Sequence, residues 1–168
     1  MKYEKEKLNI EEGIKREWVI TNGLGGYASS TILGVNTRKY HGLLVAPLNP
    51  PGSRNLILSK LDESIEIDGK SYGLFTNMCK NYVSDGYKYL ERFEKEYIPI
   101  FTYKVEDVEI KKFICMEHGK NTVAVLYTIK NGDHTGKFTV APIINFRDFH
   151  STTKDYDFNL KQDITENK

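Results

Sequence analysis

Strict alternation of apolar and polar residues in the middle of the chain is the feature that most limits how it can fold. In 101–106, Phe101, Tyr103 and Val105 alternate with polar residues, and Val108 and Ile110 continue the pattern in 108–111. A period of two is typical of strands that bury one face and expose the other. The pattern therefore predicts an antiparallel β structure rather than a helical one.

Turn signals divide the rest of the chain into further short strands. Asp-Gly at 68–69 is the strongest hairpin signal, and Asn-Gly at 22–23 and at 131–132 marks two more turns. Residues 87–98 fit a helix by their charges and a strand by their aromatic side chains. Besides the alternating segments, strands are predicted at 17–20, 43–46, 55–60, 64–67, 70–75, 112–116, 122–129, 137–144 and 156–160.

This spacing of strands and turns is typical of an all-β fold, an antiparallel β-sandwich or barrel. The chain has 168 residues, which fits one domain. We expect residues 1–16 to form a charged N-terminal arm and residues 17–168 to form the β-sandwich domain.

The charge balance and the lack of long apolar segments exclude several function classes. Lys and Arg number 24 and Asp and Glu number 23, so the formal net charge is +1, and no basic excess points to nucleic acid or an anionic membrane. The N-terminus has no apolar stretch of the kind found in secretory signals. No apolar run approaches the ~18 residues of a membrane span. We expect a cytoplasmic protein.

Neither a metal ion nor a cofactor is predicted. Cys79 and Cys115 are far apart and form no C-x-x-C motif, so they are interpreted as two free buried thiols, with a single disulfide as the alternative. No histidine has the spacing of metal ligands. The segment 23–28 formally fits the dinucleotide pattern G-x-G-x-x-[GA], but β-branched residues follow it where a helix would have to start. Its glycines are therefore interpreted as a tight turn.

A dense polar cluster follows that turn at 36–42. It contains Asn36, Arg38, Tyr40 and His41. Arginine donates hydrogen bonds to carboxylates or sugar hydroxyls, and a tyrosine ring offers a face for stacking. Two interpretations stay open: a surface that binds a ligand, or a structural loop that docks on another domain.

A second polar cluster, Arg147, Asp148 and His150, follows the strand predicted at 137–144. Loops of a sandwich gather at its two ends, so we expect both clusters to lie at the same end. Arg38 or Arg147 would then pair with Asp148. Tyr40 and His41 would remain available to a ligand or a neighbouring domain.

No catalytic residue is predicted. A glycoside hydrolase needs two opposed carboxyl groups, whereas most carboxylates here lie in charge-rich stretches such as 91–96 and 106–109, which read as solvated faces. Nucleophile motifs such as G-x-S-x-G are also absent from the sequence.

Residues 16–150 nevertheless resemble a specific family, the N-terminal domain of the bacterial and archaeal type of glycogen debranching enzyme, an amylo-α-1,6-glucosidase. The resemblance is carried by EWVITNGLGGYASSTILGVNTRKYHGLLVA, NLILSKLDE, YIPIFTYKV, GKNTVAVLYTI and NFRDFH. It implies a β-supersandwich of the galactose-mutarotase-like kind that extends past residue 168. It also implies a C-terminal α/α barrel that carries the catalytic carboxylates.

By this resemblance, the whole protein hydrolyses α-1,6-linked glucosyl stubs of glycogen or limit dextrin. The domain would support its own catalytic domain and contact α-glucan, and the isolated chain would be inactive. An exposed strand edge or docking face would favour homo-oligomers. The alternatives are a free-standing carbohydrate-binding module and, by fold analogy alone, a small sugar mutarotase.

Overall fold

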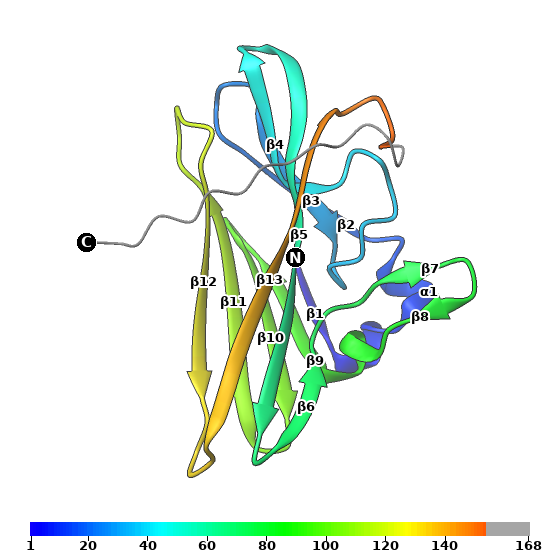
Figure 1. The fold of residues 1–168 in the computed structure, drawn as a ribbon, viewed down its shortest axis with the longest axis vertical. Helices are drawn as coiled ribbons and strands as arrows, with labels where there is room; N and C mark the ends of the chain where they lie inside the picture. Colours follow the sequence, from blue (N-terminus) through cyan, green and yellow to red (C-terminus); the bar gives the residue numbers. More distant parts are fainter. Residues whose placement is uncertain (154–168) are drawn as a thin grey trace.

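Two antiparallel β-sheets pack face to face in the computed structural model, which describes residues 1–153 (Figure 1). The first sheet has the order β1 (Lys2–Glu4), β9 (Leu90–Lys95), β10 (Pro99–Val105), β11 (Val108–Met116) and β12 (Val123–Lys130). The second has the order β13 (Gly136–Asp148), β5 (Gly52–Ile67), β4 (Gly42–Asn49), β3 (Tyr27–Thr31) and β2 (Glu17–Thr21), with β6 (Lys70–Gly73) also paired to β5. The predicted all-β antiparallel sandwich is confirmed.

The remaining elements are short. A two-stranded hairpin consists of β7 (Met78–Cys79) and β8 (Tyr82–Val83), and the helical turns are η1 (Lys5–Lys7), α1 (Ile10–Gly13) and η2 (Asp85–Tyr89). The segment 87–98 therefore holds the end of a helical turn and then a strand, β9. Within residues 1–153 no helix is long and apolar enough to span a membrane.

The period-two segments fold as predicted, and their alternation sets which face is buried. In β10, Phe101, Tyr103 and Val105 are buried, whereas Lys104 is exposed. Phe101 packs edge-on against Phe93 of β9, with ring centroids 4.9 Å apart, and against Trp18 of β2, 6.3 Å away. These three aromatic side chains join the two sheets at the centre of the core.

Two strands are longer than predicted. The segments 55–60 and 64–67 belong to a single 16-residue strand, β5. Residues 61–63 were not predicted as strand, but Leu61, Glu63 and Ile65 continue the inward-facing row while Lys60 and Asp62 lie on the opposite face. Strand β13 likewise extends to Asp148, past the predicted end at 144 and into the second polar cluster.

The predicted N-terminal arm contains an edge strand. Residues of β1 pair antiparallel with β9, and Leu8 lies in the core with 3 % of its surface exposed. Strand β3, between the glycine-rich turn and the polar cluster at 36–42, was not predicted. The strand predicted at 156–160 lies outside the described residues.

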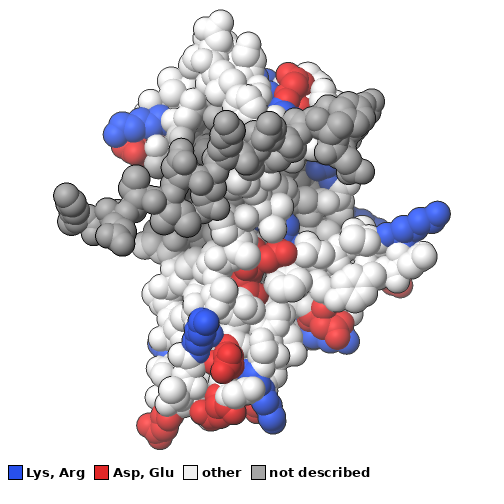
Figure 2. Space-filling model, viewed as in Figure 1, with Lys and Arg blue, Asp and Glu red and all other residues white. Residues whose placement is uncertain are grey.

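The expectation of two buried thiols needs correction. Cys79 and Cys115 are free thiols, but Cys79 is exposed on the β7–β8 hairpin and Cys115 is half-buried, so neither is a core residue. Figure 2 shows acidic and basic side chains interspersed over the lower part of the visible face. That distribution agrees with the balanced charge of the sequence.

Candidate functional site

The two polar clusters of the sequence, more than one hundred residues apart, meet in the structure. The ammonium of Lys39 donates to the carbonyl of His150 at 2.5 Å, and the guanidinium of Arg147 donates to the carbonyl of Lys39 at 2.6 Å. The hydroxyl of Tyr40 lies 3.2 Å from Nδ1 of His150. The expectation that both clusters lie in one region is therefore confirmed by geometry.

Three aromatic rings lie against one another in this region, and two of them, Tyr40 and His150, are exposed. Tyr40 packs against Phe149 and against His150, in each case with ring centroids 5.6 Å apart, and Phe149 contacts His150 at 4.0 Å. The ammonium of Lys39 lies 5.2 Å from the centre of the Tyr40 ring, a cation–π arrangement. We call Lys39, Tyr40, Phe149 and His150 the Tyr40 patch.

Arg147 holds the segment that carries the patch in place. Besides Lys39, its guanidinium donates to the carbonyls of Asp148, Phe149 and Ser151 at 3.2, 3.4 and 2.6 Å. Partial burial lowers the pKa of Arg147. Its planar donor set thus closes a loop by binding backbone acceptors rather than a carboxylate.

The predicted pairing of an arginine with Asp148 is wrong for the described residues. Oδ1 of Asp148 accepts from the backbone amide of His150 at 2.8 Å, a local turn contact typical of aspartate. Arg38 instead pairs with Glu17 of β2 at 2.6 Å. Arg38 therefore does pair with a carboxylate, but with Glu17 and not with Asp148. Nothing in the sequence around Glu17 marks it as the partner of an arginine.

His41 is a structural residue and is not available at the surface, contrary to expectation. Only 3 % of it is exposed, and its Nδ1 accepts from the amide of Thr37 at 3.1 Å. That bond requires an unprotonated Nδ1. Burial lowers the pKa of His41. The Glu17 carboxylate, which lies 3.4 Å from Nε2 without a hydrogen bond, offsets this lowering only partly.

Asn36 is also structural. Its Oδ1 accepts from the hydroxyl of Ser30 at 2.9 Å, and its Nδ2 donates to the carbonyl of Ser59 at 2.9 Å. The side chain therefore ties the loop before β4 to strands β3 and β5. Of the predicted site residues, Arg38, Tyr40, Asp148 and His150 are exposed, and Arg38 and Asp148 already have the partners named above. Asn36, His41 and Arg147 build the loop beneath.

The glycine-rich turn before β3 lies next to the patch. Asn22, fully buried, accepts from the amides of Leu24 and Gly26 at 2.9 Å each, and Gly23 and Gly25 have φ of 78° and 94°, as a tight turn requires. A groove of about 390 Å³ borders this turn, with Val19, Tyr27 and Arg54 among its lining side chains.

Two contacts connect this groove with the patch. The hydroxyl of Tyr27 donates to the carbonyl of Tyr40 at 2.8 Å, and the guanidinium of Arg54 lies 5.5 Å from the centre of the Phe149 ring. Burial raises the pKa of Tyr27, so the hydroxyl remains a donor at neutral pH. Groove and patch thus form one continuous surface of aromatic rings and basic side chains.

A buried ion pair inside the sandwich escaped the sequence analysis. The ammonium of Lys112 on β11 lies 2.5 Å from Oε1 of Glu63 on β5, and the hydroxyl of Tyr127 on β12 donates to the same oxygen at 2.6 Å. The side chains of Lys112 and Glu63 are 10 % and 4 % exposed. Burial, with the Glu63 carboxylate nearby, raises the pKa of Tyr127. The network joins the two sheets.

The Tyr40 patch brings together aromatic rings, the Lys39 ammonium and the His150 imidazole. A glycoside hydrolase needs two carboxyl groups on either side of the scissile bond, and Asp148 is the carboxylate that the two polar clusters contribute. Among residues 1–153, no three His, Cys, Asp or Glu side chains are grouped so that they could hold a metal ion. Aromatic faces and hydrogen-bond donors are what this surface offers.

Comparison with known proteins agrees with the fold and with the sequence blocks. The family model described as "Glycogen debranching enzyme N terminal" matches residues 16–168. No curated protein and no solved structure matches the chain. Because the match covers nearly the whole chain, this protein belongs to the family of glycogen debranching enzyme N-terminal domains.

Proposed function

We propose that this chain is a non-catalytic N-terminal domain of a cytoplasmic glycogen debranching enzyme of the amylo-α-1,6-glucosidase type. It supports the catalytic domain and contacts the α-glucan, glycogen or limit dextrin, through the Tyr40 patch and the adjoining groove. The observation that carries the proposal is the meeting of Tyr40 with Phe149 and His150 from the other end of the chain. Family membership supplies the substrate class.

The chemistry of the patch fits a glucan. Tyrosine combines an apolar ring with a polar edge, and the C–H face of a pyranose can rest on such a ring. The Lys39 ammonium lies beside Tyr40 and supplies donors for sugar hydroxyls. Tyr40 is 36 % exposed, which leaves ring surface available.

Support of the catalytic domain is assigned to the open edges of the sandwich. The edge strands β12 and β13 expose large apolar side chains: Leu126 by 55 %, Ile144 by 53 % and Phe146 by 59 %. Exposed apolar strand edges recruit other chains. We expect the isolated 168-residue chain to self-associate through them, which light scattering can measure; a clean monomer at high concentration would contradict this assignment.

Kinetics of the full-length enzyme test the glucan contact. Tyr40→Ala should raise KM for a branched dextrin by about 3- to 10-fold, the value of one aromatic contact, with little change in kcat. The control is Tyr97→Ala, because Tyr97 is 82 % exposed and lies in the β9–β10 turn, outside the patch. An unchanged KM would exclude the glucan contact.

Melting temperatures distinguish the proposed glucan contact from the alternative that the Tyr40 patch docks on the catalytic domain. If the patch is a domain interface, Tyr40→Ala should lower the melting temperature of the full-length enzyme and leave that of the 168-residue chain unchanged. If it is a glucan surface, both melting temperatures should stay as they are. Purified 168-residue chain should release no glucose from a branched dextrin, and release that is lost on substitution of one carboxylate would overturn the non-catalytic assignment.

A further inference from the structure

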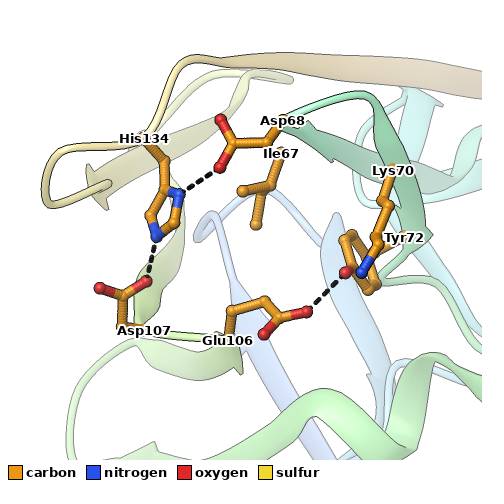
Figure 3. A pocket seen from close by; sticks show the side chains of 7 residues that line it. All are labelled: Ile67, Asp68, Lys70, Tyr72, Glu106, Asp107 and His134. Carbon is orange, nitrogen blue, oxygen red and sulfur yellow. Dashed lines mark hydrogen bonds and ion pairs between the residues drawn. The ribbon is translucent and has the colours of Figure 1, made fainter.

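A second hollow lies where three hairpins meet, at the other end of β5. The β5–β6 turn, the β10–β11 turn and the loop between β12 and β13 surround a pocket of about 450 Å³ (Figure 3). This volume lies within the range of small-molecule sites, ~300–1,000 Å³. Arg147 pairs with Leu56 of β5, whereas the pocket begins at Ile67, so roughly 35 Å of strand separates it from the Tyr40 patch. We call it the hairpin pocket.

His134 holds one side of the hairpin pocket. Its Nδ1 lies 2.6 Å from Oδ2 of Asp68, and its Nε2 lies 2.6 Å from Oδ1 of Asp107 (Figure 3). The amide of Asp68 also donates to the carbonyl of Thr135 at 3.2 Å. One imidazole therefore connects hairpins of both sheets, and each aspartate keeps one oxygen outside this bridge.

Tyr72 and Glu106 form the opposite side. The hydroxyl of Tyr72 donates to Oε1 of Glu106 at 2.7 Å, and the Tyr72 ring packs edge-on against Tyr89 with centroids 5.9 Å apart. Glu106 has φ of 55°, in the left-handed region that non-glycine residues rarely adopt. The turn thus presents this carboxylate to the pocket at a conformational cost.

The remaining lining residues add a donor and an apolar floor. Figure 3 shows the Lys70 side chain beside Tyr72 at the rim, with Ile67 between the two polar sides. Three carboxylates face one ammonium and one imidazole, so acidic and basic groups nearly balance when His134 is protonated. A strongly charged ligand has no advantage in such a pocket, whereas a neutral ring with many hydroxyls can donate to the carboxylates and accept from the lysine.

We propose that the hairpin pocket binds a pyranose ring of a neutral saccharide, at a site separate from the Tyr40 patch. Carboxylate oxygens of Asp68, Glu106 and Asp107 accept from the hydroxyls, and Lys70 donates to one of them. The apolar face of the ring rests on the Tyr72 side chain. The choice of a glucose-based probe rests on the proposed function, but the pocket itself does not depend on the Tyr40 patch.

Titration of the isotope-labelled 168-residue chain with maltotriose, followed by ¹H–¹⁵N correlation spectra, tests this proposal. We expect saturable shifts of the Asp68, Glu106 and His134 amides in the millimolar range. Glu106→Gln should weaken this binding about 10-fold through loss of charge-assisted acceptance. Tyr40→Ala should leave the shifts unchanged, so failure of the hairpin pocket and failure of the Tyr40 patch give different results.

Two results would overturn the proposal. The first is the absence of shifts at these amides with maltotriose well above millimolar concentration, in a chain whose spectrum shows it to be folded. The second is a larger response of the same amides to spermidine than to maltotriose, which would make the pocket a cation site. Glu106→Gln keeps the size of the side chain, and its spectrum reports whether the turn retains its conformation.

Discussion

Two charged bridges between the sheets, Glu63–Lys112 and the His134 bridge, differ in their exposure to water. Glu63 and Lys112 meet in the interior, with side chains 4 % and 10 % exposed. His134 meets Asp68 and Asp107 at the hairpin end, where the two carboxylates are 58 % and 67 % exposed. Water and salt screen the second bridge but hardly reach the first. The stability of the fold should therefore depend strongly on each partner of the interior bridge. It should depend only weakly on the partners of the exposed bridge, and that dependence should vary with pH and salt.

The interior bridge should show the largest effect. Lys112→Met leaves the buried Glu63 carboxylate with Tyr127 as its partner, and removal of one member of a buried pair costs about 3–5 kcal/mol of unfolding free energy. Urea unfolding measures this loss, with Lys104→Met on the exposed face of β10 as the control. The double variant Glu63→Leu and Lys112→Met should recover much of it. If Lys112→Met lost no more unfolding free energy than Lys104→Met, the interior bridge would not be the stronger of the two.

His41 should give an intermediate effect. His41→Ala removes a buried acceptor of the Thr37 amide and leaves a cavity, at a cost of about 1–3 kcal/mol. Because the pKa of His41 is lowered in the folded state, the unfolded chain binds more protons as pH falls below ~6.5, and the wild-type stability decreases there. The cost of His41→Ala, measured by urea unfolding, should therefore be larger at pH 8 than at pH 5.

His134 should behave in the opposite way and more weakly. Asp68 and Asp107 raise its pKa, so its contribution is fully present below ~6.5 and is lost as pH rises through the folded pKa. His134→Gln should lower the melting temperature at pH 5 more than at pH 8, and high salt should reduce the difference. A pH dependence with the sign of His41 would show that the two carboxylates do not hold an imidazolium.

Asp148 should give the smallest effect. An exposed carboxylate that accepts one backbone amide contributes about 1 kcal/mol or less, so Asp148→Ala should shift the melting temperature only slightly. This expectation replaces the one for a buried arginine pair, which would have cost several times more. A shift as large as that of Lys112→Met would mean that Asp148 has a buried partner.

The fold class could be predicted from the sequence because its signals are local. Alternation in 101–106 and 108–111 depends on a pattern of two residues, and the Asp-Gly turn at 68–69 depends on neighbouring φ values of 48° and 83°. The prediction of two separate strands within β5 was wrong because the continuity of β5 depends on a distant segment. Leu61 and Glu63 continue the strand because β13 pairs along it, and that pairing involves residues 136–148.

The candidate site could be predicted only in part. Tyr40 and His150 carry the right chemistry in the sequence, and their meeting was an expectation from sandwich geometry. The partners of Arg38, Arg147 and His41 could not be predicted from the sequence. Neither Glu17 nor the backbone carbonyls that bind Arg147 belong to a sequence motif. The bridge of His134 could not be predicted either, since nothing near it in the sequence points to Asp68 or Asp107.

By itself the sequence determined the antiparallel sandwich, the turns and the family, because each depends on residues close together or on a long characteristic block. Only the tertiary structure decided which polar side chains are buried and which face solvent. The alternation in β5 puts Glu63 on the same face as Leu61 and Ile65, but it does not show what covers that face. The packing of β11 and β12 over β5 buries Glu63 and gives it Lys112 and Tyr127 as partners. Contacts between residues far apart in the chain depend on the order and register of the strands and on how the two sheets pack. Only the tertiary structure specifies these.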